Sequence, residues 1–150
     1  MKKMIIETYS QDETEKIGYD TAIKALPGQI YCLSGDLGVG KTVFTRGFAR
    51  GLGIDEHITS PTFTIINEYE GRLPLYHFDV YRVADPEEMD YIGCDEYFFG
   101  NGVCLIEWAE LIEDIIPENA VWIKIEKDLE KGTDYRKITI GEDKNENTGC

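Results

Sequence analysis

A glycine-rich run that ends in lysine and threonine carries the clearest chemistry in this sequence. Gly35-Asp36-Leu37-Gly38-Val39-Gly40-Lys41-Thr42 fits the phosphate-binding pattern G-x-x-x-x-G-K-[ST]. The backbone N–H groups of such a loop point inward at phosphate oxygens, and the helix that follows adds the positive end of its dipole. The pattern predicts that Lys41 reaches the β- and γ-phosphates of a nucleotide and that the Thr42 hydroxyl holds Mg²⁺. Without a ligand, the Lys41 side chain is expected to face solvent.

Two acidic residues each follow an extended apolar run. Asp79 ends Leu75-Tyr76-His77-Phe78, and Glu107 ends Val103-Cys104-Leu105-Ile106. Because ligands of open α/β sheets bind beyond the carboxyl ends of the strands, both acids are expected beside phosphate and metal. A nucleotide hydrolase needs a carboxylate near Mg²⁺ and a group that orients the attacking water. The pattern leaves open which acid contacts the metal directly.

Other residues near these positions allow two interpretations. The segment 59–63, which contains Pro61 and Thr62, is either a switch-like loop over the γ-phosphate and Mg²⁺ or a polar turn before a strand. His77 is expected to be structural. Trp108, next to Glu107, either walls the nucleotide site or belongs to the core. The sequence has no N-K-x-D run after a strand, so adenine is the default base.

Periodicity and turn residues predict a small α/β sandwich with a mixed sheet around these motifs. A capping box that begins at Ser10 predicts a helix to about Ala25, and a second helix is expected from about Lys41 to Arg50. Further short helices are expected at 85–91 and 108–112. The expected strands are 3–8, 29–34, 63–70, 73–79, 103–106, 120–126 and 135–140, with hairpins at 63–79 and 120–140.

Length and charge narrow the class of protein. The 150 residues fit one domain, expected over 1–140, with a polar tail over 141–150 that is expected to be disordered. A formal charge of −14 argues against direct binding to nucleic acid or to an anionic membrane, and suits a basic partner or solubility alone. No apolar run is long enough for a membrane span or a signal peptide, so a cytoplasmic protein is expected. Cys32 and Cys104 are expected in the core.

Four motifs in this order resemble the bacterial TsaE (YjeE) family: the loop 35–42, then Ser60-Pro61-Thr62-Phe63, His77-Phe78-Asp79-Val80-Tyr81-Arg82 and Ile106-Glu107-Trp108. The resemblance spans roughly residues 5–126 and implies a P-loop NTPase-like three-layer sandwich that binds ATP or ADP with Mg²⁺. It implies that Glu107 and Lys41 are catalytic and that Thr42, Asp79 and Glu107 lie at the metal. The implied nucleotide contacts are Gly35, Asp36, Leu37, Gly38, Val39, Gly40, Lys41, Thr42, Thr62 and Trp108.

The same resemblance implies a function in tRNA modification. The ATPase of this family supports turnover of a TsaD–TsaB complex, which adds threonylcarbamoyl to adenosine 37 of tRNAs that read ANN codons. Contact with tRNA is then expected to be indirect, and hydrolysis is expected to be slow without the partner because no arginine finger is evident in the chain. Two alternatives remain open: a small-molecule P-loop kinase and a non-catalytic nucleotide-sensing module.

Overall fold

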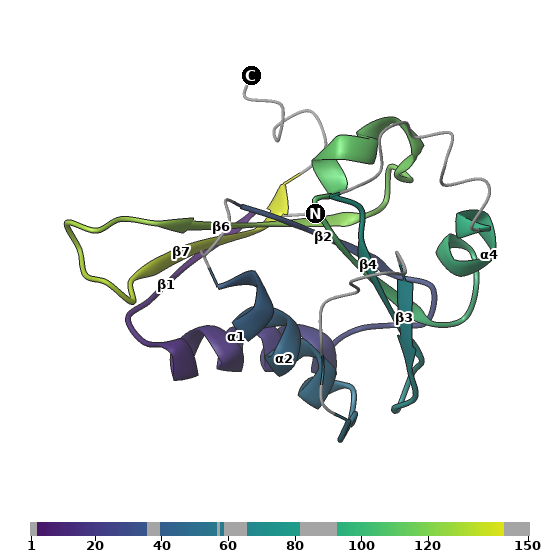
Figure 1. Cartoon of the computed structure of the whole chain (residues 1–150), viewed down its shortest axis with the longest axis horizontal. Coiled ribbons are helices and arrows are strands. Elements are labelled where there is room, and N and C mark those ends of the chain that lie inside the picture. Colours follow the sequence, from purple (N-terminus) through teal and green to yellow (C-terminus); the bar gives the residue numbers. More distant parts are fainter. Residues whose placement is uncertain (1–2, 36–39, 57, 59–65, 82–92, 143–150) are drawn as a thin grey trace.

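The computed structural model describes residues 3–35, 40–56, 58, 66–81 and 93–142 (Figure 1). Their centre is a seven-stranded sheet of order β1-β7-β6-β2-β5-β4-β3. Its strands are β1 (Met4–Thr8), β2 (Ile30–Ser34), β3 (Ile66–Tyr69), β4 (Leu75–Asp79), β5 (Val103–Glu107), β6 (Val121–Lys127) and β7 (Arg136–Glu142). Helices α1 (Gln11–Ile23) and α2 (Lys41–Gly51) lie side by side on one face, while α4 (Cys94–Phe98) and the 3₁₀ helix η1 (Ala109–Ile115) lie on the other.

The sheet is parallel in its middle and antiparallel at both edges. Strand β2 pairs in parallel with β5 and β6, and β5 pairs in parallel with β4. The hairpin partners β3 and β7 run antiparallel to β4 and β6, and β1 adds antiparallel to β7. This is the mixed α/β sandwich that the sequence predicts. The parallel arrangement brings the carboxyl ends of β2, β4 and β5 to one edge, where the glycine-rich loop begins.

Two apolar cores fill the space on either side of the sheet. Along β2, Tyr31 and Leu33 join the core under α1 and α2, whereas Ile30 and Cys32 join the core under α4 and η1. Such a strand is buried on both faces, as expected for the centre of a parallel sheet. Cys104 of β5 also lies in the second core, so the predicted core positions of Cys32 and Cys104 are confirmed.

Close contact between α1 and α2 fixes the helix that follows the glycine-rich loop. The predicted cap of α1 is present: the Ser10 side chain accepts a hydrogen bond from the Glu13 N–H at 3.1 Å. A Cβ atom at Gly47 of α2 would lie 1.9 Å from the Glu15 carbonyl oxygen, and one at Gly18 of α1 would lie 2.3 Å from the Phe44 carbonyl oxygen. Glycine at both positions lets the two backbones touch, and so sets where α2 begins.

Most of the predicted elements are present, with shifted ends. Helix α1 ends at Ile23, and β7 continues through Gly141 to Glu142. The short helix α4 and the pairing of β1 with β7 have no counterpart in the sequence prediction. The predicted helix 85–91, the tail from residue 143 and the start of the strand predicted from 63 lie outside the described residues. Every helix in the described part of the chain is too short or too polar to cross a lipid bilayer.

Candidate nucleotide-binding site

The glycine-rich loop lies between β2 and α2, and the structure describes its two ends. Gly35 follows the last residue of β2, and Gly40 caps α2 with a φ of 99°, in the left-handed region that glycine favours. Lys41 and Thr42 form the first turn of α2, so they lie at the positive end of its dipole. The predicted nucleotide contacts Asp36, Leu37, Gly38, Val39 and Thr62 lie outside the described residues.

A cavity of about 370 Å³ opens at this edge of the sheet. It gathers the predicted site residues from three elements: Gly40, Lys41 and Thr42 from the start of α2, Asp79 from β4, and Glu107 from the end of β5 with Trp108 directly after it. Residues that the sequence did not indicate complete the lining: Gln11, Thr14, Val43, Asp134 and Arg136. A single concave site therefore holds the Thr42 hydroxyl, the Asp79 and Glu107 carboxylates and the Lys41 ammonium, together with a third carboxylate and an arginine.

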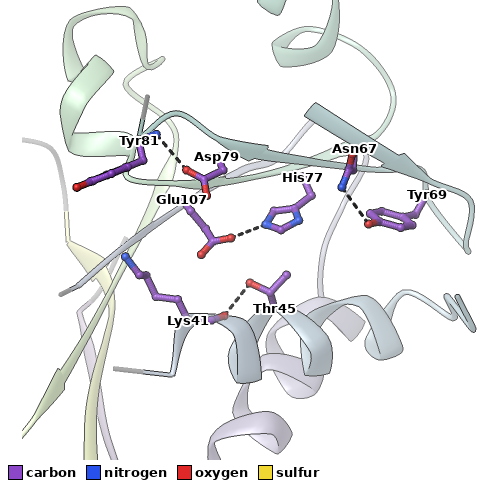
Figure 2. Close-up of polar contacts among 8 residues, drawn as sticks. All are labelled: Lys41, Thr45, Asn67, Tyr69, His77, Asp79, Tyr81 and Glu107. Atoms are coloured by element: carbon purple, nitrogen blue, oxygen red, sulfur yellow. Dashed lines mark hydrogen bonds and ion pairs between the residues drawn. The ribbon is translucent and has the colours of Figure 1, made fainter. Parts of the chain in front are cut away.

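The two acids are neighbours on adjacent strands. Asp79 and Glu107 are register partners at the ends of β4 and β5. Asp79 Oδ1 accepts a 3.0 Å hydrogen bond from the Tyr81 N–H, which turns the chain after β4. Glu107 is only 5% exposed, and one of its oxygens lies 2.6 Å from His77 Nε2 (Figure 2). The two acids thus differ in environment: Asp79 is half-buried, whereas Glu107 is buried and hydrogen-bonded to His77.

Lys41 is buried, contrary to the expectation that it faces solvent. Its side chain is 6% exposed because two groups cover the ammonium. The Nζ donates a 2.8 Å hydrogen bond to the Gly35 carbonyl and lies 3.6 Å from the centre of the Trp108 ring. A cation over an aromatic face is attracted by the ring quadrupole, and Trp is the strongest such partner. The Gly35 carbonyl and the Trp108 ring therefore contact the ammonium that the sequence predicts to bind phosphate.

Trp108 lies between the core and the cavity. Its ring packs against the second core and also lines the cavity, beside Lys41 and 4.8 Å from the Tyr81 ring. Its backbone has φ 63° and ψ 30°, the only positive φ outside glycine in the described residues. Such strain costs about 1–3 kcal/mol and persists where surrounding contacts over-determine it. The strained turn aims the indole back over the start of α2.

One further acid lies near Lys41. Glu110 lies in the first turn of η1, two residues after Trp108. Its Oε2 is buried without a hydrogen-bond partner among the described residues. Burial raises the pKa of the Glu110 carboxyl, and the nearby positive charge of Lys41 opposes that rise. Nothing in the sequence pattern distinguished this acid from the others of η1.

No group of three or more His, Cys, Asp or Glu side chains in the described residues is arranged to hold a metal by itself. At nucleotide sites, one or two protein oxygens share Mg²⁺ with phosphates and water. Thr42, Asp79 and Glu107 line the same cavity and supply the hard oxygen donors that Mg²⁺ prefers. The residues present therefore fit a nucleotide with Mg²⁺.

The chain is similar to proteins of one known family. The family model described as "Threonylcarbamoyl adenosine biosynthesis protein TsaE" matches residues 8–138. The chain belongs to the TsaE family. It is 52% identical to the tRNA threonylcarbamoyladenosine biosynthesis protein TsaE of Bacillus subtilis, over 93% of this chain and 86% of that protein. Its identity to the TsaE protein of Treponema pallidum is 51%, over 75% of this chain and 82% of the relative.

The fold agrees as well. A crystal structure of Bacillus subtilis YdiB superposes with a TM-score of 0.76 at 48% identity, covering 93% of this chain and 84% of that one. The TsaE family model ends at residue 138, so it includes Asp134 and Arg136, which also line the cavity. Sequence reasoning missed these two because only the pairing of β7 with β6 and β1 returns them to α2. The ideal Cβ position at Gly40 lies 3.7 Å from Arg136 Nε, so an in-chain arginine does stand beside the loop.

Proposed function

We propose that this chain binds and hydrolyses ATP in threonylcarbamoyladenosine synthesis, as a cytoplasmic subunit that supports turnover of a TsaD–TsaB complex. The observation that carries the proposal is the convergence of Lys41, Thr42, Asp79 and Glu107 on one cavity at the start of α2. Membership of the TsaE family supplies the pathway, because the relatives are named for tRNA threonylcarbamoyladenosine biosynthesis. Adenosine 37 of tRNAs that read ANN codons is the substrate that the family implies for the complex.

Each residue has a distinct role in this proposal. Lys41 leaves the Trp108 ring to pair with the β- and γ-phosphates, and the Thr42 hydroxyl and Asp79 hold the metal side. Glu107 orients the attacking water toward the γ-phosphorus. Mg²⁺, when bound, supplies neutralisation of the charge that develops on the phosphate oxygens. Trp108, which packs against the Tyr81 ring, walls the cavity and limits the access of bulk water.

The strongly acidic chain suits a protein partner better than tRNA. A polyanion is bound through cations that displace its counterions, and a formal charge of −14 opposes this. Contact with tRNA is therefore assigned to the partner proteins, with the acidic surface steering docking onto them. Tight binding of tRNA to the isolated chain near physiological salt would contradict this part of the proposal.

Phosphate release from ATP tests the proposal directly. The assay compares the chain alone, the chain with TsaD–TsaB, and the chain with small phosphate acceptors such as nucleosides and sugars. We expect slow release from the chain alone and faster release with TsaD–TsaB. Release that depends on a small acceptor would indicate a kinase, and nucleotide binding without release in any mixture would indicate a sensing module.

A further inference from the structure

The imidazole of His77 contacts Glu107, the acid that orients the attacking water in the proposed function. His77 Nε2 lies 2.6 Å from Glu107 Oε2, and the two side chains come from adjacent parallel strands (Figure 2). His77 is 1% exposed and is not among the residues that line the cavity. It therefore has no direct access to a ligand, and whatever it does for the reaction passes through Glu107.

The direction of this hydrogen bond follows from the other ring nitrogen. His77 Nδ1 is buried, and no hydrogen-bond partner for it exists among the described residues. A proton on Nδ1 is therefore a buried donor without a partner there, whereas a proton on Nε2 is donated to a carboxylate oxygen, which can only accept. His77 is thus the donor, and Glu107 Oε2 is the acceptor.

This contact fixes a side chain that otherwise has considerable freedom. A glutamate has three rotatable side-chain bonds, and misplacement of a reacting group by about 1 Å lowers a rate about a hundredfold. The contact occupies one Glu107 oxygen, while the other is directed away from His77, on the side where Lys41 lies (Figure 2).

We propose that His77 is a positioning residue for Glu107: its Nε2–H holds the carboxylate at the angle needed to orient the attacking water. The inference rests on the proposed function and deepens it. A purely structural histidine would also be buried and hydrogen-bonded, but its loss would lower stability without a selective effect on the rate of hydrolysis.

The test uses two substitutions that differ in reach. The amide nitrogen of His77→Gln lies as many bonds from Cα as Nε2 does, so it can still donate to Glu107. The amide of His77→Asn is one bond shorter and falls short. We measure steady-state ATP hydrolysis with TsaD–TsaB, nucleotide affinity and melting temperature. These are measured for both His77 variants, for Glu107→Gln, and for the double variant of His77→Asn with Glu107→Gln. Phe78→Leu, a neighbouring core change on β4, is the stability control.

We expect His77→Asn to lower kcat about tenfold to a hundredfold with nucleotide affinity within about twofold, and His77→Gln to recover most of the loss. In the Glu107→Gln background, His77→Asn should cause no further loss, because the residue acts through Glu107. Phe78→Leu should lower the melting temperature and leave kcat unchanged.

The outcomes separate this inference from the function on which it rests. A wild-type chain that hydrolyses no ATP even with TsaD–TsaB would overturn both. An active wild type combined with a normal kcat in His77→Asn, or with an equal loss in Phe78→Leu, would overturn the positioning role alone. An undiminished effect of His77→Asn in the Glu107→Gln background would do the same.

Discussion

The Lys41 ammonium and the Trp108 ring form a close cation–π pair, with Nζ 3.6 Å from the ring centre. In the proposed function the same ammonium pairs with phosphate, so binding of a nucleotide exchanges one partner for another. A desolvated cation–π contact of this kind is worth about 2 kcal/mol, against about 1.5–3 kcal/mol for a hydrogen bond to a charged group. In the proposed function, several phosphate oxygens therefore replace the indole as partners of the Lys41 ammonium.

The exchange makes Trp108 a reporter of nucleotide binding. The sequence contains two tryptophans, and the other, Trp122, is buried in the second core. In a Trp122→Phe variant, we expect ATP with Mg²⁺ to change the emission of Trp108, because the cation leaves its ring. Adding Lys41→Met, which keeps the aliphatic stem without the charge, should remove most of the response. A full response in the absence of the Lys41 charge would contradict the exchange.

Lys41→Ala tests the phosphate-binding role. Loss of a charge-assisted contact should weaken nucleotide binding at least about tenfold, since each 1.4 kcal/mol is a factor of ten. The fold should persist, because α2 is held by its packing on α1 and by Phe44 and Phe48 in the core. Isothermal titration gives the affinity and circular dichroism the fold. An unchanged affinity would exclude Lys41 from the phosphate site.

Substitution of each acid by its amide separates binding from chemistry. Glu107→Gln keeps an acceptor for His77 and should leave nucleotide affinity within about tenfold, while hydrolysis falls by about a hundredfold or more. Asp79→Asn keeps the acceptor for the Tyr81 N–H and should instead reduce the dependence of nucleotide affinity on Mg²⁺. Binding titrations with and without Mg²⁺, and phosphate release with TsaD–TsaB, measure these effects. If the two variants show exchanged phenotypes, the roles of Asp79 and Glu107 are reversed.

Gly47→Ala tests the contact that sets the position of α2. Alanine favours a helix by about 1 kcal/mol over glycine, so local propensity alone predicts a stabilised protein. The new Cβ would lie 1.9 Å from the Glu15 carbonyl oxygen, and backbone must move to avoid it. Overpacking of this kind costs about 1–3 kcal/mol, so we expect a lower free energy of unfolding in urea. Arg46→Ala, on the exposed side of the same helix, should stay within about 0.5 kcal/mol of wild type.

The buried thiols should resist alkylation. Burial raises the pKa of the Cys104 thiol to about 12, and Cys32 and Cys94 are buried with it. Because the thiolate is the nucleophile, a Cys150→Ser variant should react slowly with iodoacetamide at pH 8 and quickly once unfolded. The raised pKa also means that the unfolded chain loses this proton first, so its contribution to stability declines as the pH rises above about 9. Rapid labelling of the native variant would contradict this burial.

The sequence predicted the places of Asp79 and Glu107 at the sheet edge better than the cavity around them. Asp79 and Glu107 could be placed together because each ends a strand, and parallel strands deliver such residues to the same edge. The burial of Lys41 was not predictable, since it depends on a left-handed turn at Trp108, a conformation that no local pattern of bulky residues favours.

Long-range pairing accounts for the other differences. Arg136 and Asp134 reach the cavity only because β7 pairs with β6 and β1, and strand order is not encoded in any single segment. The contact of His77 with Glu107 likewise needs β4 and β5 to be neighbours in one particular register. Sequence patterns define the elements, whereas tertiary register decides which side chains meet.

The pairing of β1 with β7 has a consequence for synthesis on the ribosome. Met4 is made before its register partner Ile140, so β1 acquires a strand neighbour only after all the elements from α1 to β6 have been made. Loop closure over such a separation is slow compared with the formation of local helices and hairpins. During translation, the exposed apolar residues of β1 have no partner strand, and Arg136 has not yet been made. The sheet is therefore completed in one late step, when β7 inserts between β1 and β6, and only then does Arg136 reach the cavity at the start of α2.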